Sequence, residues 1–182
     1  MPRILGTQVM LREYRQDDLP WMRQWANDPE VVVHLSDIFL YPHTLESTEA
    51  FLHMMIDGSP DCKGFVIADR NDGAYIGQIS LDTIDWKNRV GRIGIVIGSA
   101  EHMGRGYGTE AMKLLIGFAF REMNLNRLEL EVFDFNDRAI RCYASCGFVQ
   151  EGRLRERQYK KGQYWDVLQM GLLKSEWKDD TP

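Results

Sequence analysis

The chain has 182 residues, of which 44% are apolar and 27% are charged, a balance that fits a globular domain with a sizeable core and disfavours disorder. Its 22 basic and 27 acidic side chains give a formal net charge of −5, which argues against nucleic acid as a partner and favours a cationic substrate. The sequence has no apolar run of about eighteen residues and no signal-peptide pattern at its start, so we expect a cytoplasmic protein with no membrane partner.

The cysteine content argues against a disulfide framework. The three cysteines, Cys62, Cys142 and Cys146, are an odd number, which indicates a reducing compartment. Cys142 and Cys146 could share a helix face, but no partner pair of Cys or His stands at ligand spacing, and the four histidines are scattered. We therefore expect no metal site.

The first half of the chain predicts, in order, one strand, two helices and a hairpin, at residues 7–15, 17–31, 44–58, and 63–70 with 74–85. The first helical pattern stops near Pro29, and Gly58 with Pro60 ends the second. The two halves of the hairpin flank the sequence Asn-Asp-Gly at 71–73, which is a strong turn signal.

The second half predicts a strand–helix–strand unit, a further helix and two strands, at residues 90–99, 109–124, 127–136, 137–147, 148–159 and 164–174. The strand at 90–99 is apolar and β-branched, as is typical of a strand buried on both faces. The helix after it is long enough to join two parallel strands by a right-handed crossover. The basic stretch from Gly152 to Gln163 fits the polar tip of a hairpin. No repeat or linker interrupts the chain, so we expect one α/β domain over residues 1–182.

A glycine-rich loop precedes the helix of the crossover. The sequence HMGRGYGTEA at 102–111 places Gly104, Gly106 and Gly108 between a strand and a helix start. Ligands of α/β sheets bind beyond the carboxyl ends of strands, and the free amides of a helix N-terminus bind anions. Neither a dinucleotide fingerprint nor a P-loop fits the spacing. The loop favours a ligand that carries phosphate over a purely structural turn, which stays the alternative.

Further along the chain, Asn136 ends a predicted strand and Tyr143 follows seven residues later on a helix. The stretch GRGYGTEA, followed by NDRAIRCYASCGFVQEGRLRE, resembles the two cofactor motifs of the GNAT superfamily of N-acetyltransferases. The opening LREYRQDDL resembles the first strand and helix of that family, and the branches that the chain most resembles contain ribosomal-protein N-terminal and spermidine acetyltransferases. This resemblance implies a mixed, mostly antiparallel sheet of six to seven strands with about four helices, in which a splayed parallel strand pair holds coenzyme A.

The resemblance also implies acetyl-CoA as the co-substrate. In family terms, the backbone of the 90–99 strand binds the pantetheine, and the amides of the glycine loop hold the pyrophosphate with added charge from Arg105. For Asn136 a hydrogen bond to the cofactor stands beside an equally weighted alternative, a cap of the following helix. The cofactor-binding residues implied are Ile95, Val96, Ile97, Met103, Gly104, Arg105, Gly106, Tyr107, Gly108, Thr109 and Asn136.

Tyr143 is the implied catalytic residue. Its phenol would protonate the leaving thiolate as a general acid, and a strand amide near Ile95 would stabilise the oxyanion. The alternative for Tyr143 is a buried aromatic residue that packs helix against sheet. Cys142 and Cys146 are expected to be helix packing residues, because direct transfer requires no covalent enzyme intermediate.

The general base is left unassigned. Many relatives carry Glu where this chain has Arg92, and a guanidinium cannot act as a base at neutral pH. Arg92 could instead bind an acidic group of the substrate. The candidates for the base, each of which is more typical of a surface or structural residue, are His34, Asp82, Asp85 and Glu131. The alternative is a proton relay through water.

The resemblance therefore predicts direct transfer of an acetyl group from acetyl-CoA to a primary amine, such as a protein N-terminus, a polyamine or another small amine. The alternative is a catalytically inactive CoA-binding sensor or scaffold of the same fold, which Arg92 keeps open. In this family the first two helices and the loop at 34–44 cover the acceptor site, where Trp21, Trp25, Phe39 and Tyr41 could line a pocket, although the two tryptophans fit the core face of a helix better. Homodimers are common among relatives.

Overall fold

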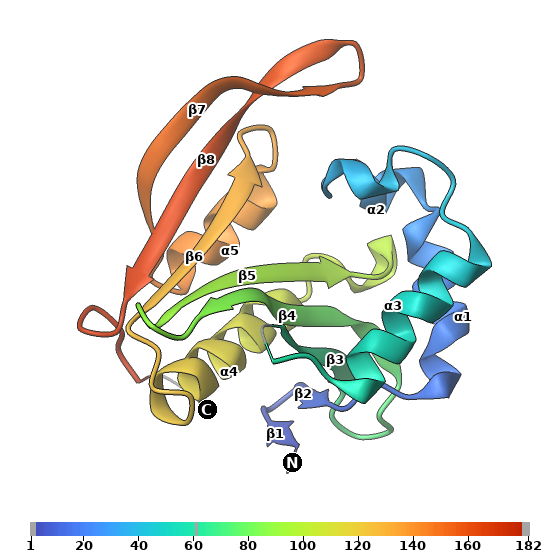
Figure 1. Cartoon of the computed structure of the whole chain (residues 1–182), viewed down its shortest axis with the longest axis horizontal. Helices are drawn as coiled ribbons and strands as arrows, with labels where there is room; N and C mark the ends of the chain where they lie inside the picture. Colours follow the sequence, from blue (N-terminus) through green and yellow to red (C-terminus); the bar gives the residue numbers. More distant parts are fainter. Residues whose placement is uncertain (1–2, 61, 180–182) are drawn as a thin grey trace.

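One eight-stranded sheet, in the order β1-β2-β3-β4-β5-β6-β8-β7, organises the computed structural model, which describes residues 3–60 and 62–179 (Figure 1). The strands are β1 (Ile4–Leu5), β2 (Val9–Arg12), β3 (Lys63–Asp69), β4 (Tyr75–Asp85), β5 (Val90–Ile97), β6 (Arg127–Phe133), β7 (Val149–Lys160) and β8 (Gln163–Leu173). The helices are α1 (Leu19–Ala26), α2 (Pro29–Val32), α3 (Leu45–Asp57), α4 (Tyr107–Arg121) and α5 (Asp137–Ser145), and short 3-10 turns are η1 (Gln16–Asp18), η2 (Asp37–Phe39) and η3 (Ala100–His102). Within the described residues, no helix is both long and apolar enough to cross a membrane.

The mixed α/β architecture was predicted correctly. The described residues form eight strands and five α-helices, where six to seven strands and about four helices were expected. The eighth strand, β1, has only two residues and pairs with β2, and so short a segment leaves too little alternation to detect. The helix predicted at 17–31 is divided, because α1 ends at Ala26 and α2 begins at Pro29. The Asp28 side chain caps α2 by accepting the Glu30 amide at 2.9 Å, and proline at the first helical position lacks the N–H that would continue α1.

Strands β5 and β6 are the parallel pair joined by α4, as predicted, but they pair over only three positions. The last pair is Arg92 with Glu129. Beyond it β6 turns away from β5 toward β8, which Figure 1 shows as a widening gap between the two ribbons. The expectation that β5 is buried on both faces was therefore wrong. Arg92 is exposed, and Ile95 and Ile97 are only half-buried, because β6 no longer covers that edge.

Two apolar cores lie on opposite faces of the sheet. On one face, α4 packs on the sheet through fully buried residues such as Leu115 and Phe120. On the other face, α1 and α3 pack through Met22, Trp25 and Leu52. Successive side chains of β5 alternate between these faces, so Ile93 joins the first core and Val96 the second. The sheet thus separates an α4–α5 side from an α1–α3 side, and the gap between β5 and β6 lies between the two.

Strands β7 and β8 form a long hairpin that extends past the rest of the sheet (Figure 1). Its turn connects Lys160 to Gln163, so the basic stretch at 152–163 covers most of β7, and only its end forms the predicted hairpin tip. Near the tip, the Lys160 ammonium donates to the Leu35 carbonyl at 2.7 Å, and the Gln158 amide donates to Asp37 at 2.6 Å. The hairpin is therefore tied to the segment that follows α2.

Candidate active site

The glycine-rich loop forms the N-terminal end of α4. Gly104 and Gly106 have φ of +76° and +87°, a left-handed conformation that glycine adopts without a steric penalty, and Gly106 is the N-cap of the helix. A Cβ atom at Gly104 would have no neighbour within 4 Å, and one at Gly106 would meet only the Gln8 side-chain nitrogen at 3.8 Å. Gly108 lies in the first helical turn with a negative φ. The loop therefore offers open space above amides that point out of a helix N-terminus.

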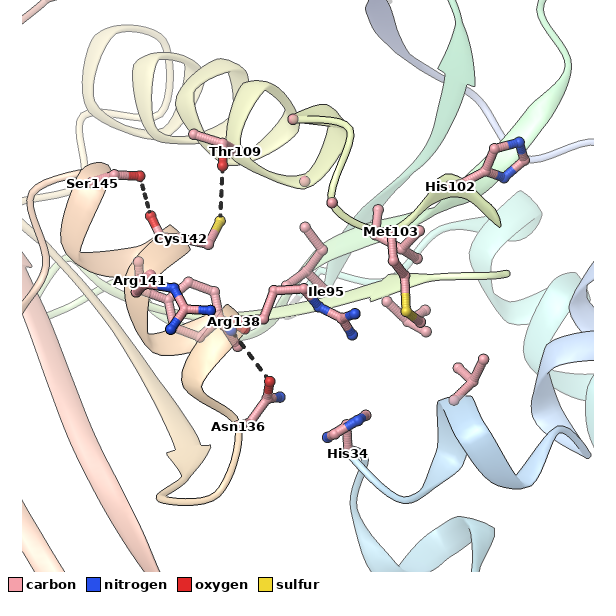
Figure 2. Close-up of a pocket in the computed structure, with 18 of the residues that line it drawn as sticks. His34, Ile95, His102, Met103, Thr109, Asn136, Arg138, Arg141, Cys142 and Ser145 are labelled. Carbon is pink, nitrogen blue, oxygen red and sulfur yellow. Dashed lines mark hydrogen bonds between the residues drawn. The ribbon is translucent and has the colours of Figure 1, made fainter. Parts of the chain in front are cut away.

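A cavity of about 410 Å³ opens in front of this loop (Figure 2). It contains all of the cofactor-binding residues implied by the sequence except Arg105 and Tyr107. Arg105 is exposed, while Tyr107 is half-buried against the core and packs edge-on to His102 with ring centroids 6.0 Å apart. The described lining residues among the implied set are Ile95, Val96, Ile97, Met103, Gly104, Gly106, Gly108, Thr109 and Asn136.

The floor of this cavity is the uncovered edge of β5. The Gly98 amide donates to the Ile76 carbonyl of β4 at 2.8 Å, and backbone groups alternate in direction along a strand. Val96 therefore also turns its backbone toward β4, whereas Ile95 and Ile97 turn theirs into the gap that β6 leaves. Buried backbone groups require hydrogen-bond partners. The amides and carbonyls of Ile95 and Ile97 are thus placed for an extended ligand that carries amides of its own.

Helix α5 forms the wall opposite β5. Asn136 caps this helix by accepting the Ala139 amide at 3.2 Å, so the capping alternative is confirmed, and the same side chain lines the cavity. The Thr109 hydroxyl lies 3.3 Å from the sulfur of Cys142, a contact that Figure 2 draws. The Cys146 thiol approaches the Thr109 carbonyl at 3.8 Å. Both cysteines therefore pack α5 on the first turn of α4, as expected.

Two arginines that sequence reasoning missed, Arg138 and Arg141, also line the cavity from α5 (Figure 2). They are three residues apart on one helix, and residues at that spacing lie on one face. Two arginines at this spacing on a predicted helix are the sequence signal that could have identified them. Two guanidinium groups beside the N-terminus of α4 make this end of the cavity electropositive, which suits a phosphorylated ligand.

A second cavity, of about 480 Å³, opens on the α1–α3 side of the sheet. Its walls come from α1, the segment after α2, and strands β4, β5 and β6. Of the aromatic residues proposed for an acceptor pocket, Trp25 and Phe39 line it, while Trp21 and Tyr41 are exposed outside it. The core-face expectation thus holds for Trp25, which is buried, and was wrong for Trp21, which is 54% exposed.

The two cavities meet at the gap between β5 and β6. The residues that line both are His34, Leu35, Ile95, Val96, Asn136 and Tyr143. A ligand lying along β5 in the first cavity can therefore present its end to a molecule held in the second. This meeting point is where a group could pass between two substrates.

Tyr143 stands at the meeting point on α5. Its ring packs edge-on to Phe148 with centroids 6.3 Å apart and joins the core on the α4 side, so part of its surface is structural. Burial raises the pKa of the phenol, and the neighbouring Cys142 and Cys146 raise it further. The phenol thus remains protonated across the neutral range and can donate a proton.

The carboxylates of the second cavity differ in their hydrogen-bond and ion-pair partners. Glu131 accepts from Arg92 at 2.8 Å, and Asp37 accepts from Gln158. Asp82 lines the cavity, and desolvation raises its pKa although a Ser80 hydrogen bond and the charge of Arg92 oppose the rise.

The other two base candidates have different surroundings. Asp85 is exposed outside the described cavities and accepts the Asn88 amide at 2.9 Å, so it caps its own turn. His34 stands at the meeting point, where burial lowers the pKa of its imidazole, as does the charge of Arg138. Its Nδ1 is buried without a hydrogen-bond partner in the described part of the chain.

Comparison with known proteins gives one family and several relatives. A family model for the acetyltransferase (GNAT) domain matches residues 8–149. An uncharacterized N-acetyltransferase of Bacillus licheniformis, p20, is 30% identical over 180 residues, which cover 97% of this chain and 99% of the relative. The putative ribosomal N-acetyltransferase YdaF of Bacillus subtilis is 36% identical over 109 residues, which cover 60% of this chain and 59% of that protein.

Among solved structures, the spermidine N-acetyltransferase of Vibrio cholerae in complex with CoA and spermine superposes with a TM-score of 0.82 at 27% identity. The match covers 93% of this chain and 97% of the other. A dodecameric structure of the spermidine N-acetyltransferase from the same organism matches with a TM-score of 0.77 at 28% identity, over 92% of this chain and 95% of that one.

Proposed function

The chain belongs to the GNAT acetyltransferase family, and on that premise we propose that it moves the acetyl group of acetyl-CoA directly to a primary amine while both substrates are bound. The meeting of the two cavities at Tyr143 carries this proposal. One cavity reaches the meeting point from the glycine loop and the other from the α1–α3 side. Direct transfer requires two substrates that touch, and this arrangement supplies one place for each.

Two features of the first cavity, its open glycine loop and its arginines, support acetyl-CoA as its ligand. The left-handed backbone of Gly104 and Gly106 leaves open space where a side chain would stand, so the α4 amides can receive the pyrophosphate. Arg138 and Arg141 add positive charge for phosphate oxygens. The backbone of Ile95 and Ile97 would bind the amides of the pantetheine arm, as a neighbouring strand would. Val96 contributes only its side chain, because its backbone pairs with β4.

Acetyl-CoA supplies an activated acyl group with a thiolate as the leaving group. Tyr143 would hold its phenolic proton at the meeting point and deliver it to that sulfur as the bond breaks. The raised pKa of the phenol keeps the proton in place until then. The Ile95 amide, which faces the gap, would stabilise the negative charge on the carbonyl oxygen. Direct transfer requires no acyl-cysteine, and Cys142 lines the first cavity but not the one proposed for the amine.

The second cavity would hold the amine. The relatives include a spermidine acetyltransferase and a putative ribosomal acetyltransferase, so both a polyamine and a protein N-terminus belong to the proposed acceptor class. A homodimer is the assembly that we propose, and the dodecamer of the Vibrio relative supports self-association in this family. A cytoplasmic location is proposed as well, and it is supported by three cysteines that are all free thiols.

The test is release of free thiol from acetyl-CoA in the presence of spermidine, a short peptide with a free amino terminus and a simple alkylamine. We expect at least one amine to stimulate thiol release well above hydrolysis, with double-reciprocal plots that intersect, because both substrates must be bound together. Parallel plots would indicate a covalent enzyme intermediate and contradict direct transfer. Failure of every amine, with CoA still bound by calorimetry, would contradict the transferase activity.

A further inference from the structure

Strand β4 contains a bulge at Asp82. Leu81 pairs with Ile93 of β5 and Thr83 pairs with Arg92, so Asp82 has no partner across the strands. The burial pattern agrees, because Leu81 and Ile84 enter the core while the two residues between them are exposed. Asp82 and Thr83 therefore lie on the same face of the sheet, the one that forms the second cavity. Asp82 shares this face with Ser80 by the ordinary alternation of a strand, and the bulge adds Thr83 to it.

The carboxylate of Asp82 lies across β5 on top of Gly94. A Cβ atom at Gly94 would fall 2.3 Å from the Asp82 carboxylate oxygen Oδ2, closer than any real contact allows. The absence of a side chain at position 94 therefore makes room for this carboxylate. Gly94 lies between Arg92 and Val96 on one face of the strand, and Val96 lines both cavities. Asp82 thus presents its charge one step nearer the meeting point than position 92.

The surroundings of Asp82 leave it available to a ligand. Its one hydrogen bond in the described chain comes from the neighbouring Ser80 hydroxyl. Arg92 is within electrostatic reach, but its guanidinium donates to Glu131 on β6. The other titratable groups that face Asp82, Tyr14 and Cys62, are neutral at neutral pH because burial raises the pKa of each.

The remaining carboxylates that line the second cavity have hydrogen-bond or ion-pair partners among the described residues. Glu131 is paired with Arg92, while Asp37 accepts from Gln158 and lies 3.6 Å from the Lys160 ammonium. Asp82 is therefore the carboxylate that the described lining residues leave without an ion pair. Desolvation also raises its pKa, so it accepts a proton more readily than an ordinary aspartate.

We propose that Asp82 holds the ammonium group of the acceptor and takes one of its protons before the amine attacks. This inference rests on the proposed function and assigns the general base, a role that the Arg92 guanidinium cannot take at neutral pH. The neutral amine forms a bond from nitrogen to the acetyl carbon, the bond from that carbon to sulfur breaks, and Tyr143 gives its proton to the sulfur. The second proton lost by the nitrogen returns to the Tyr143 phenolate, and Asp82 releases its proton to solvent, so protons and charges balance.

The test compares wild-type protein with Asp82→Asn, Asp82→Glu and the control Asp85→Asn, using the amine that gives thiol release. Asp85 is an exposed carboxylate on the same strand that lies outside the described cavities. We expect Asp82→Asn to lower kcat/KM for the amine about 10²- to 10⁴-fold at neutral pH, the range for loss of a general base. Asp82→Glu should recover part of the loss, and Asp85→Asn should stay close to wild type. CoA affinity by calorimetry should be equal in all four proteins.

The pH dependence separates this role from a structural one. In Asp82→Asn only the free amine can react, so kcat/KM should climb about tenfold per pH unit toward the pKa of the amine, and the deficit should shrink as the pH rises. A deficit that is the same at every pH, or full activity of Asp82→Asn, would overturn the proposal for Asp82 and leave the transferase activity standing. Failure of the wild type with every amine would overturn both.

Discussion

The guanidinium of Arg92, in the last residue pair of β5 with β6, donates at 2.8 Å to the carboxylate of Glu131, which lies two residues beyond the last paired residue of β6. The ion pair therefore bridges β5 and β6 where their backbones begin to part. Both side chains are partly exposed, at 46% and 37%, and an ion pair of that kind contributes about 0–1 kcal/mol. Arg92 thus has an ion-pair partner within the protein, which argues against a role in binding an acidic group of the substrate.

Arg92→Gln should alter the pH dependence of activity more than stability. The cation lowers the pKa of Asp82, so its removal raises that pKa, and the acid limb of kcat/KM for the amine should move to higher pH. The free energy of unfolding in urea should change by less than about 1 kcal/mol. Arg121→Gln is the matched control, because Arg121 forms a similarly exposed pair with Asp179 at 3.0 Å. An acid limb that stays in place in Arg92→Gln would contradict the electrostatic link to Asp82.

Tyr143→Phe should remove the proton donor and keep the ring. We expect kcat to fall about 10²- to 10⁴-fold, with little change in the KM for acetyl-CoA, because the phenol acts on the leaving sulfur. Phe148 would retain its aromatic neighbour, so thermal unfolding should hardly change. Tyr159→Phe, on the exposed tip of the β7–β8 hairpin, is the control that should retain wild-type rates. Normal turnover by Tyr143→Phe would rule out the general-acid role.

Gly106→Val should weaken CoA binding, because it strains the backbone of the loop and fills open space in front of it. Valine at the left-handed φ of +87° is strained by about 1–3 kcal/mol, and its side chain would enter the open space where we propose that phosphate binds. Gly162→Val provides the control, because Gly162 has a φ of +81° and open space around it but lies at the hairpin tip. Calorimetry should show at least a tenfold loss of CoA affinity for Gly106→Val alone. Equal affinities in the two variants would argue against a phosphate site at the loop.

Cys142 should react with iodoacetamide at lower pH than Cys62. The neighbouring Cys146 thiol and the Thr109 hydroxyl lower the pKa of Cys142, whereas burial raises that of Cys62. The thiolate of Cys142 therefore forms at lower pH than that of Cys62, and mass spectrometry of alkylated peptides can follow both sites. Cys146→Ala removes a donated hydrogen bond and should shift the reaction of Cys142 to higher pH.

Bound CoA should slow alkylation of Cys142, which lines the first cavity, and leave Cys62 unaffected. Equal protection of both thiols, or of neither, would mean that CoA does not occupy this cavity.

Local sequence patterns were sufficient for most elements because each depends on neighbours in the chain. The Asn-Asp-Gly turn at 71–73 connects β3 to β4, and the glycine loop lies between a strand and the start of a helix, as predicted. Asn136 caps α5 through a bond three residues away. The two-residue β1 and the division at Asp28 were missed, because so few residues give no periodic signal.

The sequence by itself determined the order of the elements, the glycine loop at the start of α4 and the placement of Tyr143 on the helix after β6, because these follow from spacing along the chain. Only the tertiary structure decided which carboxylates are free, since Glu131, Asp37 and Asp82 differ in partners that come from other strands and loops. Side-chain direction depends on strand register, which places Asp82 together with Ser80 on the face of β4 that lines the second cavity. Register is set by packing across the sheet, which no stretch of the chain specifies alone.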